Sequence, residues 1–178
     1  MSAAEDARSG ASFPAMRSAK VPRSIVAGPY GHPFHAIAVT IPIGAWSSSL
    51  VFDILGLAAD DPEAFASGSR LLIAIGLVGA VVASVLGFLD MSRIAKRTPA
   101  HRTALVHMVL NLTAIVLFTI GLLVRLADAE RVPVVAFVIS LIAAAGLSVS
   151  GWLGGKLAYR WGVRVADENT QREGFEQR

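Results

Sequence analysis

The chain alternates between long apolar stretches and short polar links. The apolar stretches cover residues 36–57, 71–89, 105–124 and 134–157, each about 19 to 24 residues long. A helix of ~20 residues crosses a hydrocarbon core ~30 Å thick, and isolated segments in lipid must satisfy their own backbone hydrogen bonds as helices. Because the links are short, consecutive helices are expected to be antiparallel neighbours. The pattern predicts an all-α fold, an integral membrane up-down four-helix bundle.

The segments outside these stretches are polar. Residues 1–30 are rich in Ser, Ala and Pro, and their charged residues are not followed by the apolar core of a cleavable signal peptide. We expect a disordered cytoplasmic tail over residues 1–30, and a second cytoplasmic tail without fixed structure over residues 166–178. The four-helix transmembrane domain then occupies residues 31–165.

Composition supports a membrane protein and narrows its chemistry. The chain is 54% hydrophobic and 16% charged, against ~45–50% and ~25% in ordinary soluble domains. It has no cysteine, which excludes thiolate metal sites, iron–sulfur ligation and thiol nucleophiles. It also lacks a nucleotide-binding glycine loop and a zinc-protease His-Glu-x-x-His motif. The sequence shows no catalytic signature, which favours a role other than that of an enzyme.

The positive charge follows the topology of the predicted bundle. Cytoplasmic segments of membrane proteins are enriched in Lys and Arg, so both termini are expected in the cytoplasm of a bacterial cell, with the chain crossing the plasma membrane several times. We therefore expect the lipid bilayer to be the partner of the chain. The net charge of +3 is explained by the topology and does not indicate nucleic-acid binding. The basic residues on the expected cytoplasmic side are Arg8, Arg17, Lys20, Arg23, Arg93, Lys96, Arg97, Arg102, Lys156, Arg160, Arg164, Arg172 and Arg178.

A few polar residues interrupt the apolar stretches at regular spacing. His35 and Asp53 are 18 residues apart, and so are His107 and Arg125. Eighteen residues make five whole helical turns, so each pair lies on one helix face. The first and third helices run in the same direction and can both turn these faces to the centre. We expect Asp53 and Arg125 to form a structural ion pair near the far side of the membrane.

A second group is expected on the cytoplasmic side, made of His32, His35, Asp90, His107 and Asn111. Imidazole ligates metals and haem when a carboxylate or amide orients it. Three interpretations remain open. His35 and His107 bind a b-type haem, with Asn111 or Asp90 supporting them; or His32, His35, His107 and Asp90 hold a non-haem metal such as iron or zinc; or the histidines bind no cofactor and only anchor the bundle.

These interpretations lead to different functions. A haem or metal site would serve membrane electron transfer and imply a membrane redox partner. A bundle without a cofactor would be a structural or accessory membrane subunit. A small channel or transporter is a weaker third option that would need a homo-oligomer, because four helices are too few for a self-contained inverted-repeat transporter.

Several short motifs follow one another along the chain: Gly31-His32-Pro33-x-His35, Ile41-Pro42-Ile43-Gly44, Val51-Phe52-Asp53, Gly87-Phe88-Leu89-Asp90, His107-x-x-x-Asn111, Gly151-Trp152-Leu153-Gly154-Gly155 and Tyr159-Arg160. Taken in this order, they resemble the bacterial predicted membrane proteins that share domain of unknown function 2231. The resemblance covers roughly residues 30–165 and implies a four-span membrane protein; some members of the family are joined to a Rieske iron–sulfur domain, which implies a redox setting for those members. This chain has Ala36 where the family usually has proline, and Trp161 where it often has histidine.

Overall fold

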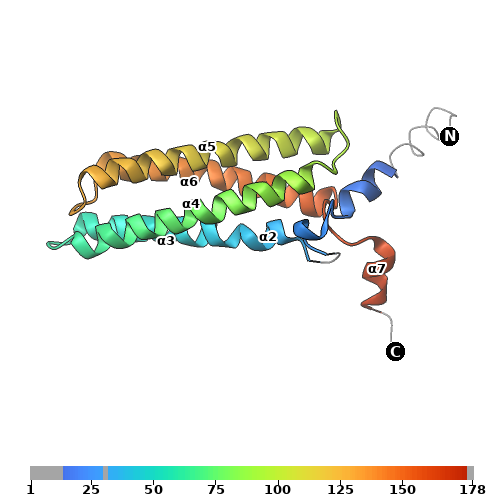
Figure 1. Cartoon of the computed structure of the whole chain (residues 1–178), viewed down its shortest axis with the longest axis horizontal. Coiled ribbons are helices and arrows are strands. Elements are labelled where there is room, and N and C mark those ends of the chain that lie inside the picture. Colours follow the sequence, from blue (N-terminus) through green and yellow to red (C-terminus); the bar gives the residue numbers. More distant parts are fainter. Residues whose placement is uncertain (1–13, 30–31, 176–178) are drawn as a thin grey trace.

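Four long apolar spans lie side by side in the computed structural model, which describes residues 14–29 and 32–175 (Figure 1). Each is long and apolar enough to cross a membrane, which confirms the predicted all-α four-helix bundle. The second and third spans extend beyond the apolar stretches, because their polar ends continue as helix. The spans are α2 (Phe34–Ala38) continued by α3 (Thr40–Ala58), α4 (Glu63–Met91), α5 (Pro99–Ala127) and α6 (Val134–Gly155).

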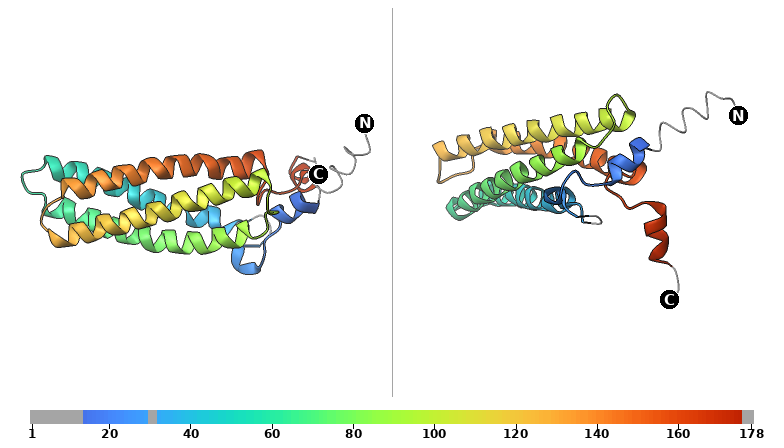
Figure 2. Two further views of the ribbon diagram at one scale, coloured as in Figure 1. Left: turned by 90° about the horizontal axis from the view of Figure 1, so that it is seen from above. Right: turned by 45° about the vertical axis from the view of Figure 1, so that its right-hand side comes forward.

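The helices form two antiparallel hairpins, α3 with α4 and α5 with α6 (Figures 1 and 2). Residues 59–62 close the first hairpin and residues 128–133 close the second, both at the same end of the bundle. We call this the loop end, and the opposite end, where α2 begins and α6 ends, the terminal end. Contacts of α4 with α5 and of α3 with α6 join the hairpins. The first and third spans therefore face each other diagonally, as predicted for an up-down bundle.

The first span is interrupted between α2 and α3. Pro42 has no backbone N–H and cannot donate to the carbonyl of Ala38, which is the last residue of α2. The backbone at Val39 stays near the helical region, with φ −65° and ψ −18°. The chain therefore continues in almost the same direction, and the faces of His35 and Asp53 stay in register.

The core of the bundle is narrow and built around one aromatic pair. The rings of Trp46 and Phe118 stack with centroids 4.1 Å apart and an interplanar angle of 11°. Ile73 packs against them, together with small residues such as Ala80 and Ala143. Small side chains let membrane helices approach closely. The outer surfaces of the helices carry exposed aliphatic side chains, which suits contact with lipid.

The amino-terminal segment differs from its expected disorder. Residues 14–20 are helical and Ile25–Ala27 form a short 3₁₀ turn. Ala19 is buried in a cluster with Ile94, Ala104 and Leu157. The segment is ordered because it can bury small apolar residues over the terminal end of the bundle, a pattern too short to be recognised in the sequence. Residues 1–13 and 30 of this expected tail, and residues 176–178 of the expected carboxyl-terminal tail, lie outside the described residues.

The carboxyl-terminal segment also has more structure than expected. The last span ends in a π-helical turn, η2 (Lys156–Arg160), and a short exposed helix, α7 (Glu168–Glu173), follows. The Asp167 side chain caps α7 by accepting hydrogen bonds from the backbone N–H groups of Asn169 and Thr170. This local cap stabilises the start of a helix that has no buried residue of its own.

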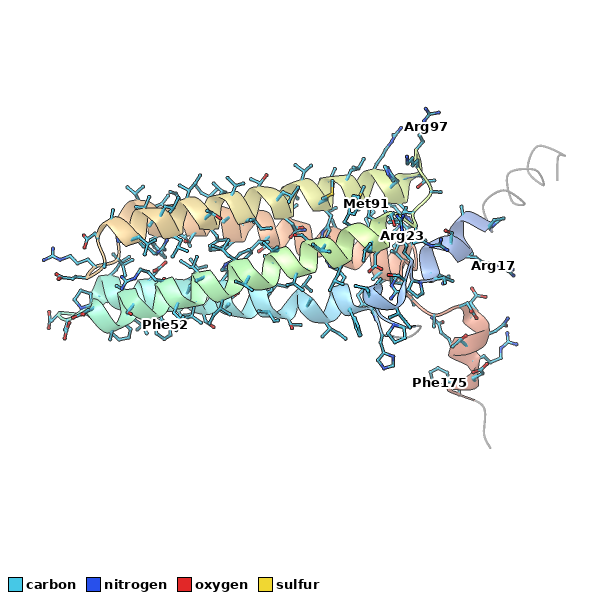
Figure 3. All side chains as sticks on the ribbon, viewed as in Figure 1. Arg17, Arg23, Phe52, Met91, Arg97 and Phe175 are labelled. Carbon is cyan, nitrogen blue, oxygen red and sulfur yellow. The ribbon has the colours of Figure 1, made fainter. Side chains whose placement is uncertain are left out.

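Charged side chains gather at the two ends of the molecule. Figure 3 places Arg17, Arg23 and Arg97 at the terminal end and Phe52 toward the loop end. This distribution leaves the middle of the bundle apolar on its outside, as a membrane-spanning protein requires.

Candidate functional site

Two histidines from diagonally opposed spans meet near the terminal end of the bundle. The ring centroids of His35 on α2 and His107 on α5 are 6.3 Å apart, and the rings are perpendicular to each other. Both side chains are half-buried. Each histidine is held by the other helix of its own hairpin, so the two hairpins present one imidazole each to the centre.

The His35 ring is fixed by α4. Its Nδ1 lies 2.8 Å from the carbonyl oxygen of Ala83. A carbonyl can only accept, so this bond places the proton on Nδ1 and leaves Nε2 with a free lone pair. The ring packs against Gly87, one turn further along α4, where an added Cβ would lie 2.9 Å from the His35 Cε1. Only glycine leaves room for the imidazole at this distance.

The His107 ring is fixed by α6 in the same way. Its Nδ1 lies 2.8 Å from the carbonyl oxygen of Ser150 and 2.9 Å from the Ser150 hydroxyl. Asn111 donates from Nδ2 to the His107 carbonyl oxygen (2.7 Å) and to the Ser150 hydroxyl (2.8 Å). An added Cβ at Gly154 would lie 3.2 Å from the His107 Cε1. His107 therefore also has a protonated Nδ1 and a free lone pair on Nε2.

The structure does not assemble the predicted four-ligand metal set. Among the described residues, no group of three or more His, Cys, Asp or Glu side chains is placed to hold a metal ion. His32 is exposed and precedes the start of α2. Asp90 is buried, but its Oδ1 lies 3.1 Å from the Nε of Arg164. The carboxylate has a basic partner at the terminal end, so of the set only His35 and His107 face each other.

Arg164 is the important residue that sequence analysis missed. Besides its ion pair with Asp90, its guanidinium donates hydrogen bonds to the carbonyl oxygens of Ala27 (3.0 Å) and Gly28 (3.2 Å). Its backbone has a φ of +60°, a left-handed conformation that is uncommon for a residue with a side chain. One arginine thus joins the amino-terminal segment, the end of α4 and the carboxyl-terminal segment. The sequence showed only another basic residue on the expected cytoplasmic side.

The predicted ion pair between the first and third spans is confirmed. Arg125 Nη2 lies 2.5 Å from Asp53 Oδ2, and the residues are 1% and 0% exposed. Ser69 donates to the other Asp53 oxygen at 2.6 Å. Arg125 also donates to the Gly121 carbonyl oxygen at 3.0 Å and to the Ser140 hydroxyl at 3.1 Å. The charges are thus paired and further satisfied by polar groups from both hairpins.

The aromatic stack separates the histidine pair from the ion pair. Trp46 and Phe118 occupy positions between these two groups along the first and third spans. The Trp46 indole N–H donates to the Ile73 carbonyl oxygen at 3.3 Å, so its polar atom is directed at α4. An apolar stack at the centre argues against a continuous polar path across the bundle.

Comparison with known proteins identifies a family. The family model described as predicted membrane protein, DUF2231, matches residues 31–167, which include all four spans. Gly31 of the first resembling motif falls within this match but lies outside the described residues. Searches of curated proteins and of solved structures gave no match. The chain belongs to the DUF2231 family of predicted membrane proteins.

Proposed function

We propose that this protein carries a b-type haem between His35 and His107 and takes part in electron transfer in the membrane with a redox partner. The observation that carries the proposal is the meeting of two imidazoles, one from each hairpin, at a centroid distance of 6.3 Å. Cofactor sites in helix bundles are commonly built from side chains on facing helices. Haem would supply one-electron chemistry, and His35 and His107 would hold it.

The distance between the two rings is compatible with one metal ion held by both. The ring centroids are 6.3 Å apart, and a metal–nitrogen(His) bond is about 2 Å long. Among the described residues, no group of three or more His, Cys, Asp or Glu side chains is placed to hold a bare ion. A cofactor that brings its own metal and further ligands would therefore suit His35 and His107 better than a bare ion.

The hydrogen bonding of both rings fits the same role. Histidines that ligate a metal through one nitrogen usually donate the other N–H to a carbonyl or carboxylate. His35 does so to Ala83, and His107 does so to Ser150. Both side chains are half-buried rather than sealed in the core.

The test is a visible spectrum of the full chain purified in detergent from cells supplied with haem. We expect a Soret band and a reduced-minus-oxidised α band, both lost in His35→Ala and in His107→Ala. His32→Ala is the matched control, because His32 precedes the same helix but is exposed, and it should keep the spectrum. Colourless protein without stoichiometric metal, or loss of the spectrum in His32→Ala alone, would overturn the proposal.

A second candidate is a structural or accessory membrane subunit without a cofactor. It is favoured by one observation: each imidazole already has a backbone partner in its own hairpin, which by itself stabilises the helix pairing. In that case His35→Ala and His107→Ala should lower thermal stability in detergent, while the wild-type chain stays colourless.

A further inference from the structure

Three contacts across the centre of the bundle join residues at one constant separation. His35 faces His107, Trp46 stacks on Phe118, and Asp53 pairs with Arg125. The members of each pair are 72 positions apart. The first and third spans thus correspond position by position along five helical turns, although most of their residues differ.

The second and fourth spans correspond with a separation of 67 positions. This separation relates Ala83 to Ser150, whose carbonyl oxygens bind the two histidine rings, and Gly87 to Gly154, which make room for those rings. Further buried positions follow the same rule: Ser69 and Ala136, Ile73 and Ser140, Gly76 and Ala143. The two hairpins therefore have the same arrangement, including the carbonyl and the glycine that fix each histidine ring.

The three contacts also show how the two repeats are related in space. When equivalent residues of two copies touch each other, they lie on either side of the axis that relates the copies. Three such contacts at successive depths define a twofold axis along the bundle, because both hairpins run in the same direction. This is the arrangement of parallel repeats about an axis along the membrane normal.

We infer that the bundle is a duplicated helical hairpin, and that Gly87 and Gly154 are equivalent positioning residues that aim His35 and His107 at the shared axis. The consequence for a ligand rests on the proposed function: His35 and His107 would hold a metal-centred group near the axis through equivalent ring nitrogens.

The positioning follows from the close fit between ring and helix. Each ring is fixed at Nδ1 by a carbonyl one turn before the glycine and lies against the glycine itself. A methyl group at Gly87 would approach the His35 ring to 2.9 Å, and one at Gly154 would approach the His107 ring to 3.2 Å. Ordinary contacts of this kind are longer, so the ring must move or give up its Nδ1 hydrogen bond. The closer approach predicts the larger effect for Gly87→Ala.

The experiment compares Gly87→Ala and Gly154→Ala with two controls on α6, Gly146→Ala and Gly151→Ala, where an added Cβ meets nothing within 4 Å. The first readout is the ¹⁵N NMR spectrum of the imidazoles in the haem-free full chain. We expect Nδ1–H tautomers for both histidines in the wild type. Gly87→Ala should shift the His35 signals while those of His107 persist as an internal control for folding, and Gly154→Ala should do the reverse.

The second readout is haem titration monitored by absorbance. Each of the two positioning variants is expected to bind haem at least tenfold more weakly than wild type, the lower range seen when outer partners of metal-ligating histidines are removed. The controls should bind as wild type does. Unchanged imidazole signals in Gly87→Ala, or equal shifts in the control variants, would overturn the inference.

The two proposals can fail separately. Imidazole shifts confined to the two positioning variants, with no haem bound by wild type, would support the inference and refute the proposed function. Haem bound equally by wild type and both positioning variants, with unchanged imidazole signals, would refute the inference and leave the proposed function in place.

Discussion

Asp53→Asn should lower the free energy of unfolding by about 3 to 5 kcal/mol, the cost of breaking a buried ion pair by removing one charge. The exchange keeps the size of the side chain and removes only its charge. Asp53 and Arg125 are both almost fully inaccessible. The guanidinium would keep the Gly121 carbonyl and the Ser140 hydroxyl, but these neutral groups do not compensate a full charge in a medium of low dielectric constant.

Arg125→Met should cost less than Asp53→Asn. The stranded Asp53 carboxylate can become neutral by taking up a proton, and Ser69 still lies within hydrogen-bonding distance of it. A stranded guanidinium cannot lose its charge in the same way. The double variant should be more stable than the sum of the two single losses predicts, because no charge remains unpaired.

The assay is reversible unfolding of the full chain in mixed micelles, followed by far-ultraviolet circular dichroism and tryptophan fluorescence. Asp61→Asn serves as the matched control, because Asp61 is an exposed carboxylate next to the loop end of the same span. It should change stability by less than about 0.5 kcal/mol. A loss below about 1 kcal/mol for Asp53→Asn, the value of an exposed pair, or strictly additive losses in the double variant would refute the reasoning.

Three further outcomes follow from the structure. Arg164→Ala removes the side-chain hydrogen bonds to the carbonyl oxygens of Ala27 and Gly28 and should speed proteolysis within residues 14–28, while gel electrophoresis should show no cleavage within the four spans. Trp46→Ala should lower the free energy of unfolding by about 3 to 5 kcal/mol, because it opens a cavity beside Phe118. A single cysteine can be placed freely in this cysteine-free chain: with the terminal end in the cytoplasm, an impermeant thiol reagent on intact cells should label Asp61→Cys and spare Arg97→Cys.

The spans and the ion pair could be predicted because long-range periodicity fixes them. A run of about 20 apolar residues leaves few structures in lipid. The 18-residue spacing from His35 to Asp53 and from His107 to Arg125 keeps each pair on one helix face whatever the surroundings. The same 18-residue spacing in both spans is also a sign of the duplication. It can be recognised as a repeat only once the contacts of His35 with His107 and of Asp53 with Arg125 are known.

The partners of Asp90 could not be predicted from the same kind of argument. Position along a helix gives its depth but not which segment from outside the bundle covers it. Arg164 reaches Asp90 from beyond the last span, through a turn with a left-handed backbone conformation. Such a contact depends on a chain path that has no periodic signal. The predicted metal set therefore included the Asp90 carboxylate, which forms an ion pair with Arg164 in the structure.

The twofold axis gives a physical reason for the residues found along it. Equivalent positions that meet on an axis bring their side chains into direct contact, so two identical charges there would repel in a medium that hardly screens them. At the depth of the ion pair the repeats have diverged to opposite charges, Asp53 and Arg125. At the depth of the stack, Trp46 and Phe118 remain alike, because aromatic faces attract each other.

At the depth of the histidines the residues are identical, which costs little while both rings are neutral and their Nδ1 protons are directed away from each other toward the carbonyls of Ala83 and Ser150. A cation held between the two rings would be stabilised by the lone pairs of their Nε2 atoms, which is how His35 and His107 would hold a metal-centred ligand.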